Sequence, residues 1–265
     1  MSVSRFMRRS ALALLLACFT ALVATQTQAQ AQTAPSTYEP SVGQPGKDVV
    51  WVPTPQALVD RMLDMAKVTP SDYVIDLGSG DGRTVITAAK RGVRALGIEY
   101  NPDMVQLSRR NAEQAGVAGR AKFRQADLFT IDLSEATVIT MFLLPGINLK
   151  LRPKLLALKP GTRIVSNTFT MGDWNVDETA HVDANCDGNW CTALLWIVPA
   201  RVAGTWKVPQ GELTLKQEFQ MLSGTLRTEG RTVPIEGKVN GEDIAFKAGG
   251  REYHAKLNGK QLEVH

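Results

Sequence analysis

Residues 74–83 have the sequence Val-Ile-Asp-Leu-Gly-Ser-Gly-Asp-Gly-Arg. The apolar residues before the first glycine predict a short buried strand, and residues 84–91 predict a helix. Three glycines at alternate positions form the turn between the two elements. A strand that runs through a glycine turn into a helix presents backbone N–H groups and a helix N-terminus to a ligand. We therefore expect a ligand-binding site at this turn.

The spacing of the glycines distinguishes two kinds of ligand. A dinucleotide site needs its third glycine three residues after the second, but that position is Arg83 and the third glycine is Gly82. Asp76, at the end of the strand, would also repel a pyrophosphate at short range. The same carboxylate suits a ligand that carries an ammonium group and a sulfonium centre. The pattern favours S-adenosylmethionine (SAM) over NAD as the cofactor. The predicted cofactor-binding turn consists of Gly78, Ser79, Gly80 and Gly82.

Two further acids follow predicted strands. Residues 94–98 predict the second strand, which ends at Glu99, 99 − 82 = 17 residues after Gly82. An acid near this spacing accepts hydrogen bonds from the ribose hydroxyls. Residues 121–126 predict the third strand, and Asp127 follows it, placed to accept the adenine amino group while Leu128 packs on the ring. Acids at three successive strand ends favour a SAM site over a glycine turn with ordinary surface acids.

Residues 1–31 are predicted to be a signal peptide. Arg5, Arg8 and Arg9 precede an apolar run over residues 11–24, and small residues at 29–31 offer a peptidase site. The run is shorter than the about 20 residues that a membrane span needs. We expect export by the general route, which makes the protein periplasmic or secreted. If the signal were not cleaved, it would associate the protein with a membrane.

Once this segment is removed, the net charge of the chain says little about its possible partners. The whole chain has 30 basic and 26 acidic residues, and the segment takes three arginines and no acid, which leaves 27 − 26 = +1. Basic residues do not alternate with aromatic ones in any stretch, so we expect no nucleic-acid partner. The three histidines, His181, His254 and His265, lack the spacing of metal ligands, which predicts no metal site.

Two cysteines remain after the signal, Cys186 and Cys191, on either side of a turn-like stretch. In an oxidising compartment they are expected to form a disulfide. Two unpaired thiols in a cytosolic protein are the alternative. Because the closed loop is short, such a bond would order the hairpin more than it would stabilise the fold.

The chain divides into regions of different composition. Residues 32–48 are rich in Gln, Thr, Ser, Pro and Gly and predict a disordered linker. Residues 49–200 alternate strands with helices, which predicts an α/β, Rossmann-like, doubly wound, mostly parallel sheet with a closing antiparallel hairpin. Residues 201–265 contain short strands separated by Gly and Asn-Gly turns and predict a small all-β C-terminal domain, a β-meander. Ligands of open α/β sheets bind outside the carboxyl ends of the strands, where the three acids fall.

The region 49–199 resembles class I, seven-β-strand SAM-dependent methyltransferases. More narrowly, it resembles the ATP synthase c-subunit lysine N-methyltransferase family and its bacterial relatives. The motifs that carry the resemblance are Trp51-Val52-Pro53-Thr54-Pro55, residues 76–83, Gly97-Ile98-Glu99-Tyr100-Asn101-Pro102, Asp127-Leu128-Phe129, residues 140–145 and Met171-Gly172-Asp173-Trp174. The resemblance implies a SAM-dependent methyltransferase whose partner is a protein with a lysine acceptor, and it adds Tyr100 to the cofactor site. It does not cover residues 201–265.

Methyl transfer is an in-line displacement at a carbon activated by its sulfonium leaving group, so the protein mainly aligns the nucleophile and excludes water. A lysine acceptor must also lose a proton, through desolvation or to a nearby carboxylate. Asp173, after the fifth predicted strand, is the candidate catalytic residue, and an ordinary surface acid is the alternative. The predicted substrate channel consists of Thr54, Pro55, Phe142, Leu143 and Pro145, and ordinary turn packing of the last three is the alternative.

Two other functions fit the same sequence. The acceptor could be a small molecule, or the protein could be an exported, non-catalytic binding protein with a SAM fold. The three acids favour an enzyme, because a site that has lost turnover should also lose one of them. Export favours the binding protein, because it takes the chain to a compartment not known to make SAM.

Overall fold

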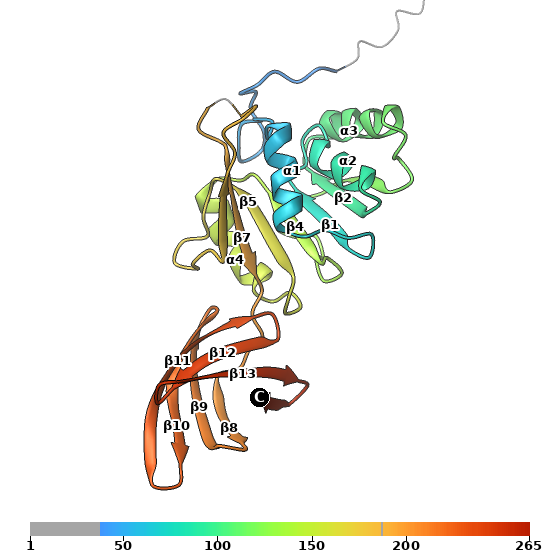
Figure 1. Ribbon diagram of the computed structural model, residues 1–265. Coiled ribbons are helices and arrows are strands. Elements are labelled where there is room, and N and C mark those ends of the chain that lie inside the picture. Colours follow the sequence, from blue (N-terminus) through green and yellow to red (C-terminus); the bar gives the residue numbers. More distant parts are fainter. Residues whose placement is uncertain (1–37, 187) are drawn as a thin grey trace, which may run out of the picture. The chain divides into compact units, whose positions relative to one another are not determined.

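The computed structural model describes residues 38–186 and 188–265 (Figure 1). The predicted signal peptide, residues 1–31, and the first residues of the predicted linker lie outside this part of the chain. No helix of the described residues has the length and apolar character that a membrane span requires.

The first sheet has seven strands in the order β3-β2-β1-β4-β5-β7-β6. Neighbouring strands among the first five are parallel, whereas β7 pairs antiparallel with both β5 and β6. The strands are β1 (Tyr73–Leu77), β2 (Arg94–Glu99), β3 (Ala121–Gln125), β4 (Val138–Met141), β5 (Arg163–Asn167), β6 (Glu178–His181) and β7 (Thr192–Ile197). This topology confirms the predicted doubly wound sheet with its closing hairpin. The strand order reverses between β1 and β4, and such a switch point leaves a crevice for a ligand.

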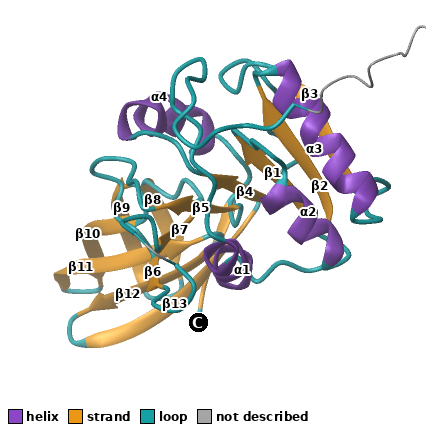
Figure 2. Cartoon of the chain, turned by 90° about the horizontal axis from the view of Figure 1, so that it is seen from above, coloured by secondary structure: helices purple, strands orange, loops and turns teal. Residues whose placement is uncertain are grey.

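Helices cover both faces of this sheet. They are α1 (Gln56–Met65), α2 (Arg83–Lys90), α3 (Pro102–Gln114) and α4 (Pro145–Leu155). The first three helices share one apolar cluster with Val74 of β1, whereas α4 shares another with Ile75 of the same strand. Figure 2 shows α4 on the opposite side of the sheet from α1 and α2. Because neighbouring strand residues point to opposite faces, β1 is buried on both sides, which explains why its residues other than Asp76 are apolar or aromatic.

The second sheet is an antiparallel meander of seven strands, each paired with its neighbour in the chain. The strands are β8 (Gly204–Val208), β9 (Gly211–Glu218), β10 (Met221–Thr228), β11 (Arg231–Asn240), β12 (Asp243–Ala248), β13 (Arg251–Asn258) and β14 (Gln261–Val264). Residues that alternate along these strands, such as Leu213, Val239 and Phe246, form a core separate from that of the first sheet. The predicted all-β C-terminal domain is confirmed.

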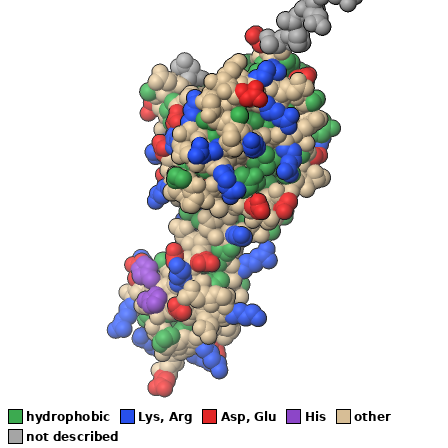
Figure 3. All heavy atoms as spheres, turned by 90° about the vertical axis from the view of Figure 1, so that its right-hand side faces the viewer, with side chains coloured by type: hydrophobic (Ala, Val, Ile, Leu, Met, Phe, Trp, Pro, Cys, Tyr) green, Lys and Arg blue, Asp and Glu red, His purple; other side chains and the backbone are tan. Residues whose placement is uncertain are grey.

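On the face of the molecule that Figure 3 shows, lysines and arginines are scattered over the surface and do not gather into one patch.

Residues 38–48 differ from the predicted disordered linker. The backbone N–H of Gly43 donates to Trp51 O at 2.8 Å, and the N–H of Trp51 donates to Gln44 O at 2.9 Å, so residues 43–51 form a closed loop. We call this loop the strap. Lys47, at its tip, pairs with Asp127 at 2.6 Å, 80 residues further along the chain. The composition of the segment does not indicate this long-range contact.

Candidate active site

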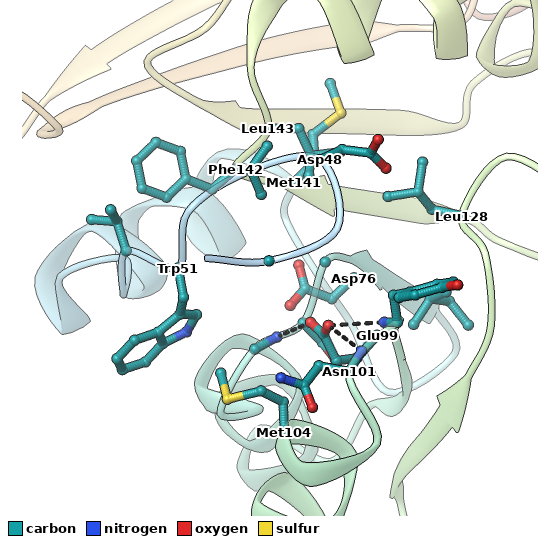
Figure 4. A pocket seen from close by; sticks show the side chains of 18 of the residues that line it. Asp48, Trp51, Asp76, Glu99, Asn101, Met104, Leu128, Met141, Phe142 and Leu143 are labelled. Atoms are coloured by element: carbon teal, nitrogen blue, oxygen red, sulfur yellow. Dashed lines mark hydrogen bonds between the residues drawn. The ribbon is translucent and has the colours of Figure 1, made fainter. Parts of the chain in front are cut away.

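A cavity lies at the carboxyl ends of β1, β2 and β4 (Figure 4). Its lining comes from the glycine turn, the residues after β2 and β3, the strap, and the loops after β4 and β5. The predicted site residues that line it are Thr54, Asp76, Gly78, Ser79, Gly80, Glu99, Tyr100, Asp127, Leu128, Phe142 and Leu143. Three other predicted residues stand at helix starts beside the lining: Pro55 before α1, Gly82 before α2 and Pro145 at the first position of α4.

The glycine turn needs glycine for two physical reasons. Gly80 and Gly82 have φ angles of +54° and +85°, a conformation that side chains other than glycine rarely adopt. A β-carbon on Gly80 would also lie 2.6 Å from Nε1 of Trp51, and one on Gly82 would lie 2.7 Å from the Phe123 ring. The first contact keeps the turn close to the strap, and the second brings the start of α2 close to β3.

Asp76 is a buried carboxylate at the end of β1. The hydroxyl of Thr140, on the neighbouring β4, donates a hydrogen bond to its Oδ1 at 2.7 Å. The pKa of Asp76 is raised to about 7, mainly by burial and less by the negative charges of Asp81 and Glu99, while the hydrogen bond from Thr140 opposes the shift. A buried carboxylate that borders a cavity favours a cationic ligand, because the opposite charge stabilises its ionised form.

Glu99 is held at the end of β2 by backbone donors. Its Oε2 accepts the N–H of Gly80 at 3.0 Å, and its Oε1 accepts the N–H groups of Tyr100 and Asn101 at 2.8 and 2.9 Å (Figure 4). Asn101 in turn caps α3, because its side chain accepts the N–H of Asp103. An ionised carboxylate has about four acceptor sites, and the three backbone donors take three of them, so the second site on Oε2 can accept a hydroxyl of a ribose.

Asp127 follows β3 and is also engaged on both oxygens. Its Oδ1 accepts the N–H of Phe129 at 2.9 Å, and its Oδ2 accepts Lys47 Nζ at 2.6 Å. The hydrogen bond from Lys47 lowers the pKa of Asp127. Lys47 also lies 4.7 Å from the centre of the Tyr100 ring. Sequence reasoning missed Lys47 because it assigned this residue to a linker.

These groups fit SAM. Asp76 complements a cationic centre, Glu99 complements a ribose hydroxyl, and Asp127 with Leu128 complements an adenine ring with its amino group. The cavity borders all four residues, so one ligand can contact them together. Among residues 38–186 and 188–265, no group of three or more His, Cys, Asp or Glu side chains is arranged to hold a metal ion.

Three aromatic rings line another part of the cavity. Phe142 follows β4, Phe169 follows β5, and Trp190 lies in the hairpin between β6 and β7. Their ring centroids are 5.3 to 6.0 Å apart. Only Phe142 was predicted from the sequence. The signal that could have identified Phe169 is its place just after a strand whose carboxyl end borders the site.

Asp173 does not line the cavity. Its carboxylate forms an ion pair with the guanidinium group of Arg152 on α4, and 70% of its side-chain surface is exposed. The hydrogen bond from Arg152 lowers the pKa of Asp173, which weakens it as a base. The geometry therefore does not support the predicted catalytic role, because an acid in this position is committed to a structural partner.

Cys186 and Cys191 are joined by a disulfide, as the spacing predicts. The bond closes the turn between β6 and β7, and Trp190 immediately precedes the second cysteine.

The sheet is doubly wound in the order given above, and carboxylates stand at the ends of three successive strands. These two features define a class I SAM-dependent methyltransferase. Comparison of the sequence with known proteins identifies the family within this class. Residues 76–178 match the sequence model of the family described as the ANTKMT methyltransferase domain. A protein-lysine N-methyltransferase of Saccharolobus islandicus is 49% identical over 144 residues, which cover 53% of this chain and 88% of the relative. The chain belongs to this family of SAM-dependent protein-lysine N-methyltransferases, which confirms the resemblance drawn from the motifs.

Two further relatives show how far the similarity reaches. The ATP synthase c-subunit lysine N-methyltransferase of Mus musculus is 38% identical over 130 residues, which cover 49% of this chain and 52% of the relative. A crystal structure described as an RNA methyltransferase from Salinibacter ruber, in complex with S-adenosyl-L-homocysteine, is 49% identical. It has a TM-score of 0.53 and covers 57% of this chain and 96% of that chain. The bound product of that relative agrees with SAM as the cofactor here.

Proposed function

We propose that this protein transfers the methyl group of SAM to the side-chain amine of a lysine in another protein. The observation that carries the proposal is one continuous cavity, bordered by Asp76, Glu99 and Asp127 in one part and by Phe142 and Trp190 in another. The first part suits a cationic nucleoside, and the second suits the aliphatic stem of a lysine. The 49% identity to a protein-lysine N-methyltransferase supports the choice of acceptor.

The residues of the cavity have roles that such a methyl transfer requires. SAM supplies a methyl group activated by its sulfonium centre. Glu99 and Asp127 orient the nucleoside, and Asp76 balances its positive charge. The ammonium group of the lysine first gives a proton to water. The lone pair of the resulting amine then forms the new N–C bond while the C–S bond breaks and leaves its electron pair on sulfur, so the product is a methylated ammonium group. The alignment of the amine with the methyl group lowers the barrier to transfer.

Transfer of a radiolabelled methyl group from SAM tests this proposal. The purified full-length chain is incubated with cell extract, and the extract is separated into protein, nucleic acid and small molecules. We expect label in the protein fraction, as methyllysine after acid hydrolysis, and little label with the Asp76→Asn variant. Label in RNA would favour the activity described for the Salinibacter ruber relative, and label in small molecules would favour a small acceptor. No binding of SAM at millimolar concentration would indicate a non-catalytic binding protein.

We also propose that the protein is exported, with residues 1–31 as its signal peptide. The disulfide between Cys186 and Cys191 supports this location, because such bonds persist in oxidising compartments. Mass spectrometry of the chain from fractionated producing cells tests the proposal. A periplasmic or secreted chain that begins near residue 32 would support it, and an intact chain in the membrane fraction would indicate an uncleaved anchor. An intact chain in the cytosol would contradict export.

A further inference from the structure

The rings of Phe142, Phe169 and Trp190 lie in a part of the cavity that the donor contacts leave unused. Figure 4 shows Phe142 and Leu128 on different sides of the cavity, with Asp76 and Glu99 between them. Each of the three rings is only half buried although it belongs to a packed cluster. We call these three residues the aromatic wall.

The aromatic wall has a defined geometry. The rings of Phe142 and Phe169 are nearly parallel, with centroids 6.0 Å apart and planes inclined by 20°. The ring of Trp190 is tilted against both, at 5.8 Å from Phe142 and 5.3 Å from Phe169. An aromatic face attracts a cation within about 6 Å of its centre, most strongly when the ring is that of tryptophan. The wall therefore combines an apolar surface for a hydrocarbon stem with an electrostatic preference for a cationic end.

The backbone that carries Phe169 is held in an unfavourable conformation. Thr168 has a φ angle of +59°, which is rare for a β-branched residue. Its N–H donates to Thr192 O at 2.7 Å, and its hydroxyl donates to Asn167 Oδ1 at 2.8 Å. Surrounding structure that maintains such a conformation is characteristic of functional sites. Here it turns the chain at the end of β5 so that Phe169 contributes to the cavity wall.

The position of Trp190, unlike that of Phe169, is restricted by a disulfide. It lies in a short loop closed by the disulfide between Cys186 and Cys191, and Cys191 is buried immediately before β7. The bond limits the conformations that this loop can adopt, so it restricts the place of the indole ring. Trp190 lies outside residues 76–178, the part that matches the family model.

We propose that the aromatic wall binds the side chain of the acceptor lysine and of its methylated forms. Trp190 determines this specificity, and the disulfide is its positioning element. A lysine arrives as a cation, and its nitrogen is cationic again after each methyl transfer, so the rings stabilise the acceptor and the product. The proposal rests on the proposed function, because it assumes a lysine acceptor.

The test compares two probes of the same shape and different charge. The first is Nα-acetyl-Nε,Nε,Nε-trimethyllysine amide, and the second is its neutral isostere, in which carbon replaces the quaternary nitrogen. Calorimetry measures both on the oxidised full-length chain saturated with S-adenosylhomocysteine. We expect the cationic probe to bind about 3- to 30-fold more tightly, which is the range of one or two cation–π contacts.

Matched variants separate charge recognition from packing. Trp190→Leu should keep the binding of the neutral isostere and lose most of the preference for the cation, and Trp190→Tyr should restore part of this preference. The double variant Cys186→Ser/Cys191→Ser should weaken the cationic probe while the affinity for S-adenosylhomocysteine stays unchanged. Trp206→Leu, on β8, removes a tryptophan outside the cavity lining and should change neither measurement.

The outcomes distinguish failure of this inference from failure of the proposed function. If S-adenosylhomocysteine does not bind to the unmodified chain, the methyltransferase proposal fails and the inference falls with it. If it binds, the inference alone is overturned when both probes bind equally, when neither binds, or when Trp190→Leu keeps the full preference. Should Trp190→Leu not fold, Phe142→Leu provides the same comparison on the neighbouring ring.

Discussion

The two parts of the cavity are built in different ways. The donor part takes its polar groups from the ends of three neighbouring strands, β1, β2 and β3, where Asp76, Glu99 and Asp127 follow one another in a regular pattern. The acceptor part takes Phe142, Phe169 and Trp190 from separate loops, and each ring depends on contacts outside its own segment. The regular part supplies the cofactor contacts of the class, and the irregular part is free to vary with the substrate.

The largest expected effect concerns the donor part. Glu99→Ala removes the acceptor for a ribose hydroxyl, and each hydrogen bond to a charged group contributes about 1.5–3 kcal/mol. We expect SAM binding, measured by calorimetry, to weaken about 10- to 100-fold, since one such bond is lost.

Two controls make this test specific. Glu113→Gln, at an exposed position of α3, should leave SAM binding unchanged. Binding of the trimethyllysine probe by the aromatic wall should also persist in Glu99→Ala at saturating S-adenosylhomocysteine, if the two parts are as separate as their construction indicates. A Glu99→Ala variant that binds SAM normally would contradict the donor assignment.

The second effect is a pH dependence that belongs to Asp76. Its pKa of about 7 lies above the ordinary value, so the folded protein without SAM keeps this group mostly neutral at pH 6. A cationic donor binds the ionised form better, so SAM affinity should rise with pH and level off above 7. The slope approaches about tenfold per pH unit at lower pH if only the ionised form binds.

Stability without ligand should change in the opposite direction. Because the folded state binds this proton more tightly than the unfolded chain does, the contribution of Asp76 to stability falls as the pH rises from about 4 to 7. Thermal unfolding with and without SAM between pH 5.5 and 7.5 measures both trends. Asp76→Asn should remove the pH dependence of binding, and an equal slope in that variant would assign the effect to another group.

The difference between the regular donor part and the irregular acceptor part also explains how much of the site could be predicted from the sequence. Asp76 and Glu99 were predictable because each lies at the carboxyl end of an apolar strand that a helix follows, and parallel strands bring these ends to one edge of a sheet. The positions of Phe169 and Trp190 depend on the left-handed backbone of Thr168 and on a disulfide, neither of which leaves a periodic pattern.

Two contacts that the sequence did not indicate have the same origin. Asp173 does follow β5, as predicted, but Arg152 lies 21 residues earlier on α4 and takes its carboxylate. Lys47 stands in a segment whose composition indicates disorder, yet it reaches Asp127. Local patterns show which residues end strands, and they do not show which charged side chains meet across the fold.

The smallest expected effect on SAM binding concerns the strap, which contacts the donor part through Lys47. Lys47 occupies Oδ2 of Asp127, the carboxylate oxygen that the backbone N–H of Phe129 leaves open, and so competes with an adenine amino group for this carboxylate. Lys47→Met removes the charge and keeps an apolar stem beside the Tyr100 ring, so Asp127 is free to accept the donor. An exposed ion pair contributes little, and we expect calorimetry to show SAM binding about two- to threefold more tightly to this variant.

Salt provides an independent measurement of the same competition. Added salt screens the exposed pair of Lys47 and Asp127, so the advantage of Lys47→Met over the unmodified chain should shrink as ionic strength rises. Asp127→Asn should remove the advantage at every salt concentration, because the contested carboxylate is then absent from both proteins. Weaker SAM binding by Lys47→Met would instead make Lys47 a group that closes the strap over the donor. The donor part would then depend, as the acceptor part does, on a residue that no strand pattern predicts.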